Sequence, residues 1–307
     1  MSKIALIYPG QGAQVCGMGK DFYEKTSVGK TLFDQASEWL GFSLPELCFV
    51  ENEKLNQTEY TQVAMVATSI VMTKVLMEAG IYPSISAGLS LGEYCALFAV
   101  GAIGEKDAIK TVRQRGILMQ KEVPFGLGGM AAVLGMEVEK IEAVIAPIEG
   151  VEIANYNCPG QIVISGKKEA VDQAGEALKE AGARRVIPLN VSGPFHSTML
   201  KGAGEKLGKV LEEIEITMPR IPYVSNVTAT EVTQKEEIKP LLEKQVYSSV
   251  RWQQSVECMI ANGVDTFVEI GPGKTLAGFI KKINRSVRIF NIEKVEDIEK
   301  VAKEIVC

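Results

Sequence analysis

Apolar and polar residues alternate along most of the chain with two different spacings. Short apolar runs that end at glycine or proline predict strands, whereas apolar residues at every third or fourth position predict helices. A strand is expected at 4–8, where it ends in the turn Pro9-Gly10-Gln11-Gly12. The next expected elements are a helix, a strand and two further helices, at 58–79, 84–89, 90–100 and 107–121.

The order of the expected elements changes between residues 125 and 193. A strand and a helix precede two strands, and a second helix and a last strand follow, at 130–136, 138–146, 151–156, 161–165, 168–181 and 185–190. This β-α-β-β-α-β order is that of a ferredoxin-like unit. We therefore predict a small subdomain at 125–193, inserted into a larger core made of 1–124 and 194–307.

Strands and helices alternate again after the insertion. Strands are expected at 222–227, 265–270 and 287–292, with helices at 256–262 and at the end of the chain. Strands that alternate with helices form mostly parallel sheets that are covered on both faces. The predicted fold class is thus α/β, with a mostly parallel sheet in the core.

Composition and charge narrow the class of protein. The chain has 307 residues, of which 46% are hydrophobic, so it can bury a large core. Its 33 basic and 38 acidic residues are mixed and form no long basic run, which argues against nucleic acid as a partner. The first apolar run is too short for a signal peptide, and polar residues interrupt the helix expected at 58–79. We expect a cytoplasmic protein without a membrane span.

Neither a metal site nor a cofactor site is predicted. The six cysteines form no C-x-x-C pair and there is only one histidine, so no zinc site is plausible and the thiols are expected to be reduced. The segment from Gly126 to Ala131 fits G-x-G-x-x-A, but it precedes a strand instead of joining a strand to a helix. Gly273-Lys274-Thr275 resembles the end of a phosphate-binding loop, but Val268 stands where the first glycine is required.

The segment Gly88-Leu89-Ser90-Leu91-Gly92 matches the nucleophile-elbow motif G-x-S-x-G. In that motif a serine lies on a sharp turn between a strand and a helix, and the glycines let neighbouring backbone pass close to it. The spacing alone is a weak signal, and an ordinary turn of small residues would look the same. The expected strand before Ser90 and helix after it favour a catalytic serine.

His196 is the only histidine in the chain. A serine needs a base to become a nucleophile at neutral pH, and histidine is the side chain that titrates there. If Ser90 is a nucleophile with a histidine base, that base is therefore His196. Taken alone, a lone histidine more often makes a structural hydrogen bond; the pairing with the elbow favours catalysis.

Several motifs together resemble one family, the malonyl-CoA:acyl carrier protein transacylases. They are Pro9-Gly-Gln-Gly-Ala-Gln14, Gly88-Leu-Ser-Leu-Gly-Glu93, Gln114-Arg115-Gly116, Asn155-Tyr-Asn-Cys-Pro-Gly160, Gly193-Pro-Phe-His196 and Glu269-Ile-Gly-Pro-Gly-Lys274. The resemblance covers essentially the whole chain. It implies a hydrolase-like α/β core with a ferredoxin-like insertion, which agrees with the order of elements predicted above.

The resemblance also implies a role for individual residues. Ser90 matches the acylated nucleophile and His196 its general base. The backbone N–H groups of Gln11 and Leu91 match the oxyanion hole, as a thioester carbonyl that becomes an oxyanion requires. Arg115 matches the arginine that holds the malonyl carboxylate, for which a planar guanidinium is well suited; composition alone would make it a helix-surface arginine. The residue before the histidine, Phe195, is expected to select malonyl over methylmalonyl groups.

Leu89 stands where the family often has a histidine, which excludes any role for a neighbouring histidine. In the family a main-chain carbonyl orients the base, and the segment 250–252 is expected to supply it here.

The implied reaction takes malonyl from malonyl-CoA to a separate acyl carrier protein, because the chain contains no carrier domain of its own. A monomer is expected. Two alternatives to a transacylase are kept. The first is a serine hydrolase of esters or thioesters, which would share the elbow and the base. The second is a catalytically silent module that binds carrier proteins. Whether the pathway makes fatty acids or polyketides stays open.

Overall fold

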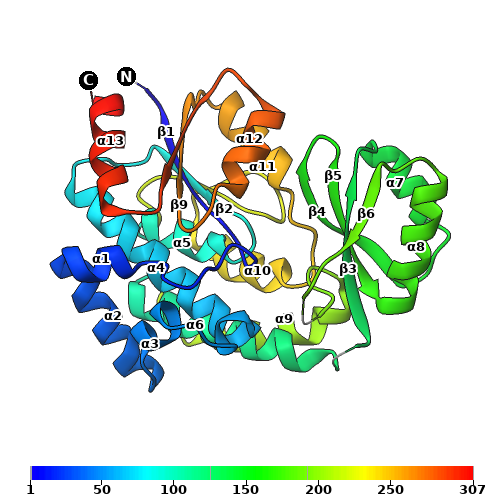
Figure 1. Ribbon diagram of the computed structural model, residues 1–307, viewed down its shortest axis with the longest axis horizontal. Coiled ribbons are helices and arrows are strands. Elements are labelled where there is room, and N and C mark those ends of the chain that lie inside the picture. Colours follow the sequence, from blue (N-terminus) through cyan, green and yellow to red (C-terminus); the bar gives the residue numbers. More distant parts are fainter. Residues whose placement is uncertain (1, 125, 192, 307) are drawn as a thin grey trace.

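The computed structural model describes residues 2–124, 126–191 and 193–306. Its larger sheet has the strand order β10-β9-β1-β2-β7-β8 and is parallel except for the last pair. Its strands are β1 (Ile4–Tyr8), β2 (Ile85–Gly88), β7 (Tyr223–Val224), β8 (Glu231–Val232), β9 (Thr266–Ile270) and β10 (Arg288–Ile292). The prediction of a mostly parallel core sheet is confirmed (Figure 1).

Helices cover both faces of this sheet, and β1 shows why. Leu6 and Tyr8 join a hydrophobic cluster on one face, whereas Ala5 and Ile7 join another cluster on the opposite face, so the whole strand is apolar and buried. The first cluster includes residues of α4 (Thr58–Glu78), α5 (Gly92–Ala99) and α6 (Glu105–Glu122). The second includes residues of α11 (Trp252–Ala261) and α12 (Thr275–Ile283).

A second, antiparallel sheet has the strand order β4-β5-β3-β6. It is formed by β3 (Gly128–Leu134), β4 (Val151–Cys158), β5 (Gln161–Lys167) and β6 (Arg185–Pro188), and α7 (Val138–Ile145) and α8 (Lys168–Glu180) pack on it (Figure 1). The ferredoxin-like order is confirmed. The bounds 125–193 stay a prediction, and residues 125 and 192 lie outside the described part of the chain.

The two sheets are joined by main-chain hydrogen bonds next to β4. The N–H of Tyr156 donates to the carbonyl of Val250 at 2.9 Å, and the N–H of Val250 donates to the carbonyl of Ala154 at 2.8 Å. The start of α11 is thereby tied to β4, which brings the antiparallel sheet against the edge of the core.

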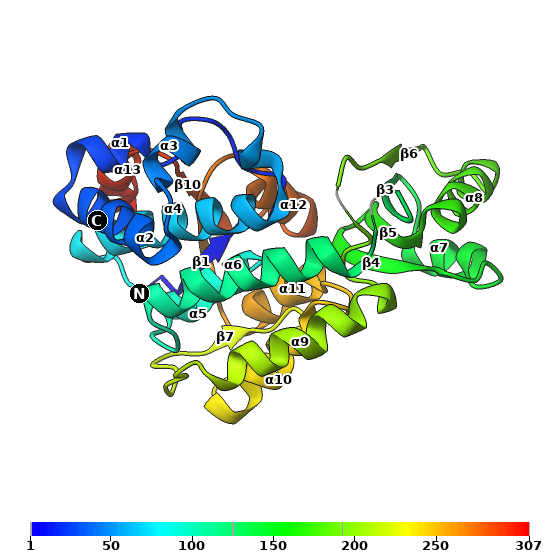
Figure 2. The same ribbon diagram turned by 90° about the horizontal axis from the view of Figure 1, so that it is seen from below.

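Several helices were not expected from the sequence. They are α1 (Lys20–Lys25), α2 (Ser27–Leu40), α3 (Leu44–Phe49), α9 (Lys201–Glu212), α10 (Lys235–Gln245) and α12, with short 3₁₀ turns at Lys54–Asn56 and Thr198–Leu200. The last helix, α13 (Val295–Val306), was expected. In Figure 2, α9 lies between α10 and the long helix α6, in agreement with the contacts that α9 makes with both.

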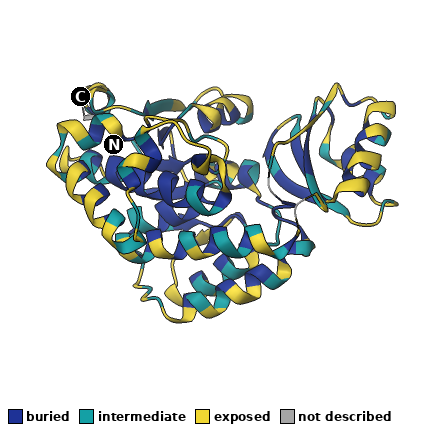
Figure 3. Cartoon of the chain, turned by 60° about the horizontal axis from the view of Figure 1, so that its bottom comes forward, coloured by how far each residue is buried: buried dark blue, intermediate teal, exposed yellow. Residues whose placement is uncertain are grey.

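Helix α4 is long and apolar enough to cross a membrane by length and composition. However, 78% of its apolar window is buried inside the protein, and 15 of its residues from Thr58 to Leu76 belong to the buried set. Figure 3 shows the same contrast across the fold, with buried residues on inward faces and exposed residues on the outer faces of helices. Helix α4 is therefore the central core helix of this fold.

Candidate active site

Ser90 lies on the turn between β2 and α5, as the elbow motif predicted. Its φ of 52° lies in the left-handed region, which a non-glycine residue rarely adopts and which stores strain at functional turns. A Cβ on Gly88 would lie 1.9 Å from the carbonyl carbon of Gly92, and a Cβ on Gly92 would lie 2.3 Å from the carbonyl oxygen of Tyr8. Glycine is required at both positions because backbone passes where a side chain would be.

Gly92→Ala is expected to lower the free energy of unfolding by about 1–3 kcal/mol, because the added methyl group overlaps the backbone of β1. Gly278→Ala is the matched control, since it also lies in a helix but has nothing within 4 Å of an added Cβ. It should be neutral or stabilising, because alanine is the better helix former. Urea denaturation measures both; equal stability of Gly92→Ala and wild type would contradict the steric argument.

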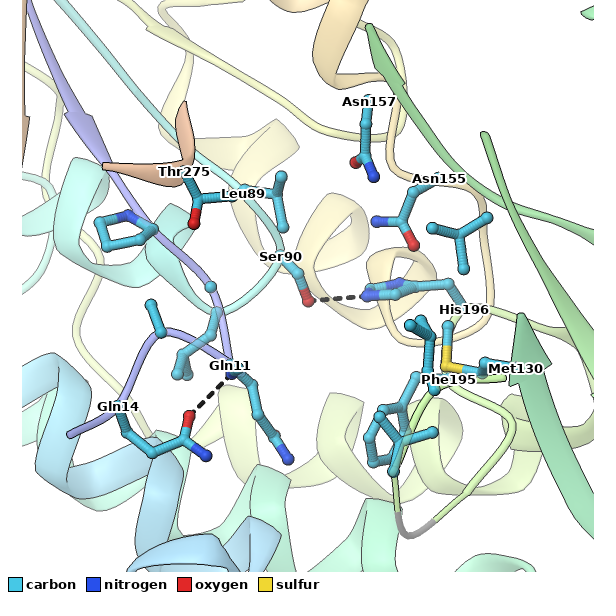
Figure 4. A pocket seen from close by; sticks show the side chains of 18 of the residues that line it. Gln11, Gln14, Leu89, Ser90, Met130, Asn155, Asn157, Phe195, His196 and Thr275 are labelled. Carbon is cyan, nitrogen blue, oxygen red and sulfur yellow. Dashed lines mark hydrogen bonds between the residues drawn. The ribbon is translucent and has the colours of Figure 1, made fainter. Parts of the chain in front are cut away.

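The structure brings Ser90 and His196 together. Ser90 Oγ and His196 Nε2 are 2.7 Å apart (Figure 4), and His196 Nδ1 is 2.8 Å from the carbonyl oxygen of Gln245. A carbonyl can only accept, so Nδ1 carries the proton and Nε2 is free to accept the proton of Ser90. The prediction that the segment 250–252 supplies the orienting carbonyl is wrong, because Gln245 supplies it. Gln245 ends α10, and a helix leaves its last carbonyls without intrahelical partners.

His196 is buried, with 4% of its surface exposed. Burial and, to a smaller extent, the positive charge of Arg115 together lower the pKa of its imidazole to about 4, and backbone hydrogen bonds oppose this shift. The ring is therefore neutral at pH 7, which is the form that accepts a proton. With Ser90 Oγ at its Nε2, it can act as the base of a nucleophilic serine.

Arg115 is not a surface residue, since only 1% of it is exposed. One guanidinium nitrogen donates to Ser90 Oγ at 3.2 Å and to Gln245 Oε1 at 3.0 Å, and the guanidinium lies 5.9 Å from the centroid of the Tyr94 ring. No ion pair between described residues includes Arg115. A buried cation without a carboxylate partner, next to a reactive oxygen, is suited to bind an anionic group.

A cavity of about 710 Å³ opens in front of the Ser90 hydroxyl (Figure 4). Its lining includes every residue predicted for the site, namely Gln11, Ser90, Leu91, Arg115, Phe195 and His196. Among the described residues, no acceptor takes a hydrogen bond from the backbone N–H of Gln11 or Leu91, so both groups remain available as donors. Leu89, which directly precedes Ser90 and places no histidine beside it, also lines the cavity.

Three residues of the site were missed from the sequence: Glu93, Asn226 and Gln245. Asn226 Oδ1 accepts from the N–H of Ser90 at 2.6 Å, and its Nδ2 donates to the carbonyl of Gly88 at 2.7 Å, which holds the elbow. Glu93 stood in the quoted elbow motif, but nothing in its spacing pointed to a role. Gln245 closes a helix rich in charged residues, and no sequence signal distinguishes it.

Comparison with known proteins identifies the family of this chain. The profile described as "Acyl transferase domain" matches residues 5–303. The malonyl CoA-acyl carrier protein transacylase of Bacillus subtilis is 49% identical over 304 residues, which cover 97% of this chain and 96% of the relative.

Solved structures give the same answer. The malonyl CoA-acyl carrier protein transacylase of Clostridium perfringens has a TM-score of 0.96 and 44% identity, and the alignment covers 99% of this chain and 98% of the other. A structure described as a type II PKS acyl-carrier protein in complex with its malonyl-transacylase has a TM-score of 0.96 and 40% identity, covering 99% and 100%. The chain therefore belongs to the acyl transferase family, within its malonyl-CoA:acyl carrier protein transacylases, and is an acyltransferase.

Proposed function

We propose that this chain transfers the malonyl group of malonyl-CoA to the phosphopantetheine thiol of a separate acyl carrier protein, through an acyl-enzyme at Ser90. The observation that carries the proposal is the position of Arg115, a buried cation whose guanidinium reaches the Ser90 hydroxyl at 3.2 Å inside the cavity. A serine and a histidine alone fit many hydrolases, whereas a fixed cation at this place fits an acyl group that carries a carboxylate.

The reaction proceeds in two half-reactions of a ping-pong mechanism. His196 Nε2 takes the proton of Ser90 while Oγ attacks the thioester carbon, and the backbone N–H groups of Gln11 and Leu91 stabilise the oxyanion. The C–S bond breaks, and the departing CoA sulfur takes the proton from His196. The carrier thiol then gives its proton to His196 and attacks the malonyl ester, and Ser90 recovers the proton as the carrier thioester forms.

Arg115 acts on the donor and not on the leaving group. Its planar guanidinium pairs with the malonyl carboxylate, which is ionised at pH 7 and costly to bury alone. This pairing also neutralises the charge that lowers the pKa of His196, so the base becomes stronger when a malonyl group is in place. The enzyme is expected to act as a cytoplasmic monomer without a cofactor.

Intact-protein mass spectrometry after mixing with malonyl-CoA tests the proposal. A stable adduct of one malonyl group that is discharged by phosphopantetheinylated carrier protein is the expected result. Release of free malonate without an adduct would mean a thioester hydrolase. No adduct and no turnover would mean a silent binding module.

Phe195 is expected to limit the size of the acyl group. Its buried ring lines the cavity directly before His196, where a methyl branch on the donor would need space. Phe195→Ser should raise the ratio of kcat/KM for methylmalonyl-CoA to that for malonyl-CoA modestly, because one methyl group in a pocket is worth about 1–3 kcal/mol. An unchanged ratio would remove Phe195 from the account of selectivity.

A further inference from the structure

A carboxyl group is buried directly beneath the candidate active site. Glu93 lies in the first turn of α5 and has no exposed surface. Its Oε2 accepts from Gln245 Nε2 at 2.7 Å and from the backbone N–H of Asn226 at 3.2 Å, whereas its Oε1 has no partner among the described residues. A fully buried carboxylate is costly unless hydrogen bonds or nearby charges compensate it, and one oxygen of this carboxylate is not compensated by a hydrogen bond from a described residue.

One arm of this network leads to the base and the cation. The side-chain amide of Gln245 donates to Glu93 and to the carbonyl of Ser90 at 2.9 Å, while its oxygen accepts from Arg115. The backbone carbonyl of the same residue holds Nδ1 of His196. Gln245 therefore contacts Arg115 through its side chain and His196 through its backbone, so a hydrogen bond that holds Gln245 in place acts on both.

The other arm leads to the nucleophile. Glu93 accepts a hydrogen bond from the backbone N–H of Asn226. The side chain of Asn226 in turn forms hydrogen bonds with the main chain of the elbow, at Gly88 and Ser90. Ser90 has a strained backbone, which persists only where its surroundings hold it. The two arms start from the same carboxylate oxygen.

We propose that Glu93 is a positioning residue for acyl transfer: its carboxylate, acting through Gln245 and Asn226, holds His196 and Ser90 in line and supplies the negative charge that offsets the proton which His196 accepts. This inference rests on the proposed function in one respect, that Ser90 is the nucleophile. Glu93 itself touches no substrate and is not a catalytic residue.

The charge of Glu93 depends on pH near neutrality. Burial raises the pKa of its carboxyl to about 7, and hydrogen bonds from Gln245 and Asn226 and the charge of Arg115 oppose this shift. The other titratable groups that interact with it are the phenols of Tyr94 and Tyr223, whose pKa values are raised, so both are uncharged at neutral pH. An ionised carboxylate accepts stronger hydrogen bonds than a protonated one.

The test compares wild type with Glu93→Gln, which keeps the shape and the accepting oxygen. The unpartnered Oε1 leaves a place for the amide nitrogen without displacing a donor. Two reactions are followed from pH 5 to 9 by mass spectrometry: acylation by malonyl-CoA and labelling of Ser90 by a neutral fluorophosphonate, which does not need Arg115. In wild type, both rates should rise with an inflection near pH 7, well above the pKa of about 4 of His196.

In Glu93→Gln the inflection should be absent and both rates at pH 8 should be about 10-fold lower, with little change in KM for malonyl-CoA. Stability should move the other way. A carboxyl whose pKa is raised above its unfolded value stabilises the fold below about pH 4.5 and loses that contribution as the pH rises through about 7. At pH 8 the glutamine variant avoids this cost, so its melting temperature should equal or exceed that of wild type.

Glu269 provides a matched control, because it is also a buried carboxylate. Both of its oxygens are used, by the N–H groups of Leu276 and Ala277 and by the side chain of Asn291. Glu269→Gln should lower the melting temperature and keep the inflection near pH 7. This pattern is what a purely structural role gives.

An inflection that persists in Glu93→Gln, or rates equal to wild type, would overturn the role of Glu93. If the fluorophosphonate labels Ser90 at a rate with the inflection near pH 7, but malonyl-CoA gives no adduct, the role of Glu93 would be supported and the malonyl assignment overturned. No labelling of Ser90 in wild type by either reagent would overturn both.

Discussion

Ser90→Ala will form no malonyl adduct, and His196→Ala will be acylated about 10²–10⁴-fold more slowly than wild type, the usual effect of losing a general base. The reason is the direct contact of 2.7 Å between Ser90 Oγ and His196 Nε2, with His196 neutral in its buried position. Rapid-quench measurement of acyl-enzyme formation from malonyl-CoA gives both rates. The loss of the only histidine removes the only candidate base for this serine.

Ser86→Ala is the control for these variants. Ser86 is also a buried serine at β2, and it donates to the carbonyl of Leu6 at 3.0 Å. Its loss should cost about 1 kcal/mol of stability and leave acylation intact. An adduct of wild-type yield in Ser90→Ala would show that another residue carries the acyl group. Full activity in His196→Ala would show that His196 is not the base of Ser90.

The sequence predicted the fold well where the hydrophobic spacing is strict. The continuous apolar run of β1 is buried and the long apolar stretch of α4 is mostly buried, and the bounds of both elements agree with the prediction to within a residue. Helix α10 was missed because it has few apolar residues and contains Pro240, although Ile238 and Leu242 are buried at helical spacing. Its stability comes from packing against α9 and β8, which no local pattern records.

The site was predictable only as far as motifs and resemblance reached. Ser90, His196 and Arg115 stood in recognisable motifs, and the structure brings them within hydrogen-bond reach of one another or of Gln245. Gln245 could not be found, because its key group is a backbone carbonyl and every residue has one. The burial of Arg115 could not be predicted either, because a helix pattern does not tell which long side chain turns inward.

Arg115→Ala should reverse the preference for the acyl donor. Wild type holds a buried cation beside Ser90, and a malonyl carboxylate left without it would be buried unpaired. Breaking such a pair costs about 3–5 kcal/mol, so kcat/KM for malonyl-CoA should fall by about 10²–10⁴-fold. A neutral acetyl group gains nothing from the guanidinium, and its removal relieves the depression of the His196 pKa. Transfer from acetyl-CoA should therefore be kept or raised.

Arg113→Ala is the matched control, because it removes an arginine from the same helix. Arg113 pairs with Glu59 at 2.7 Å and lies over the ring of Tyr60, away from the residues that line the cavity. This variant should lose some stability and keep the ratio of malonyl to acetyl transfer. Steady-state kcat/KM for both donors decides between the explanations. A parallel loss for both donors in Arg115→Ala would make Arg115 structural, because a group that recognises a carboxylate must discriminate between a donor that has one and a donor that lacks it.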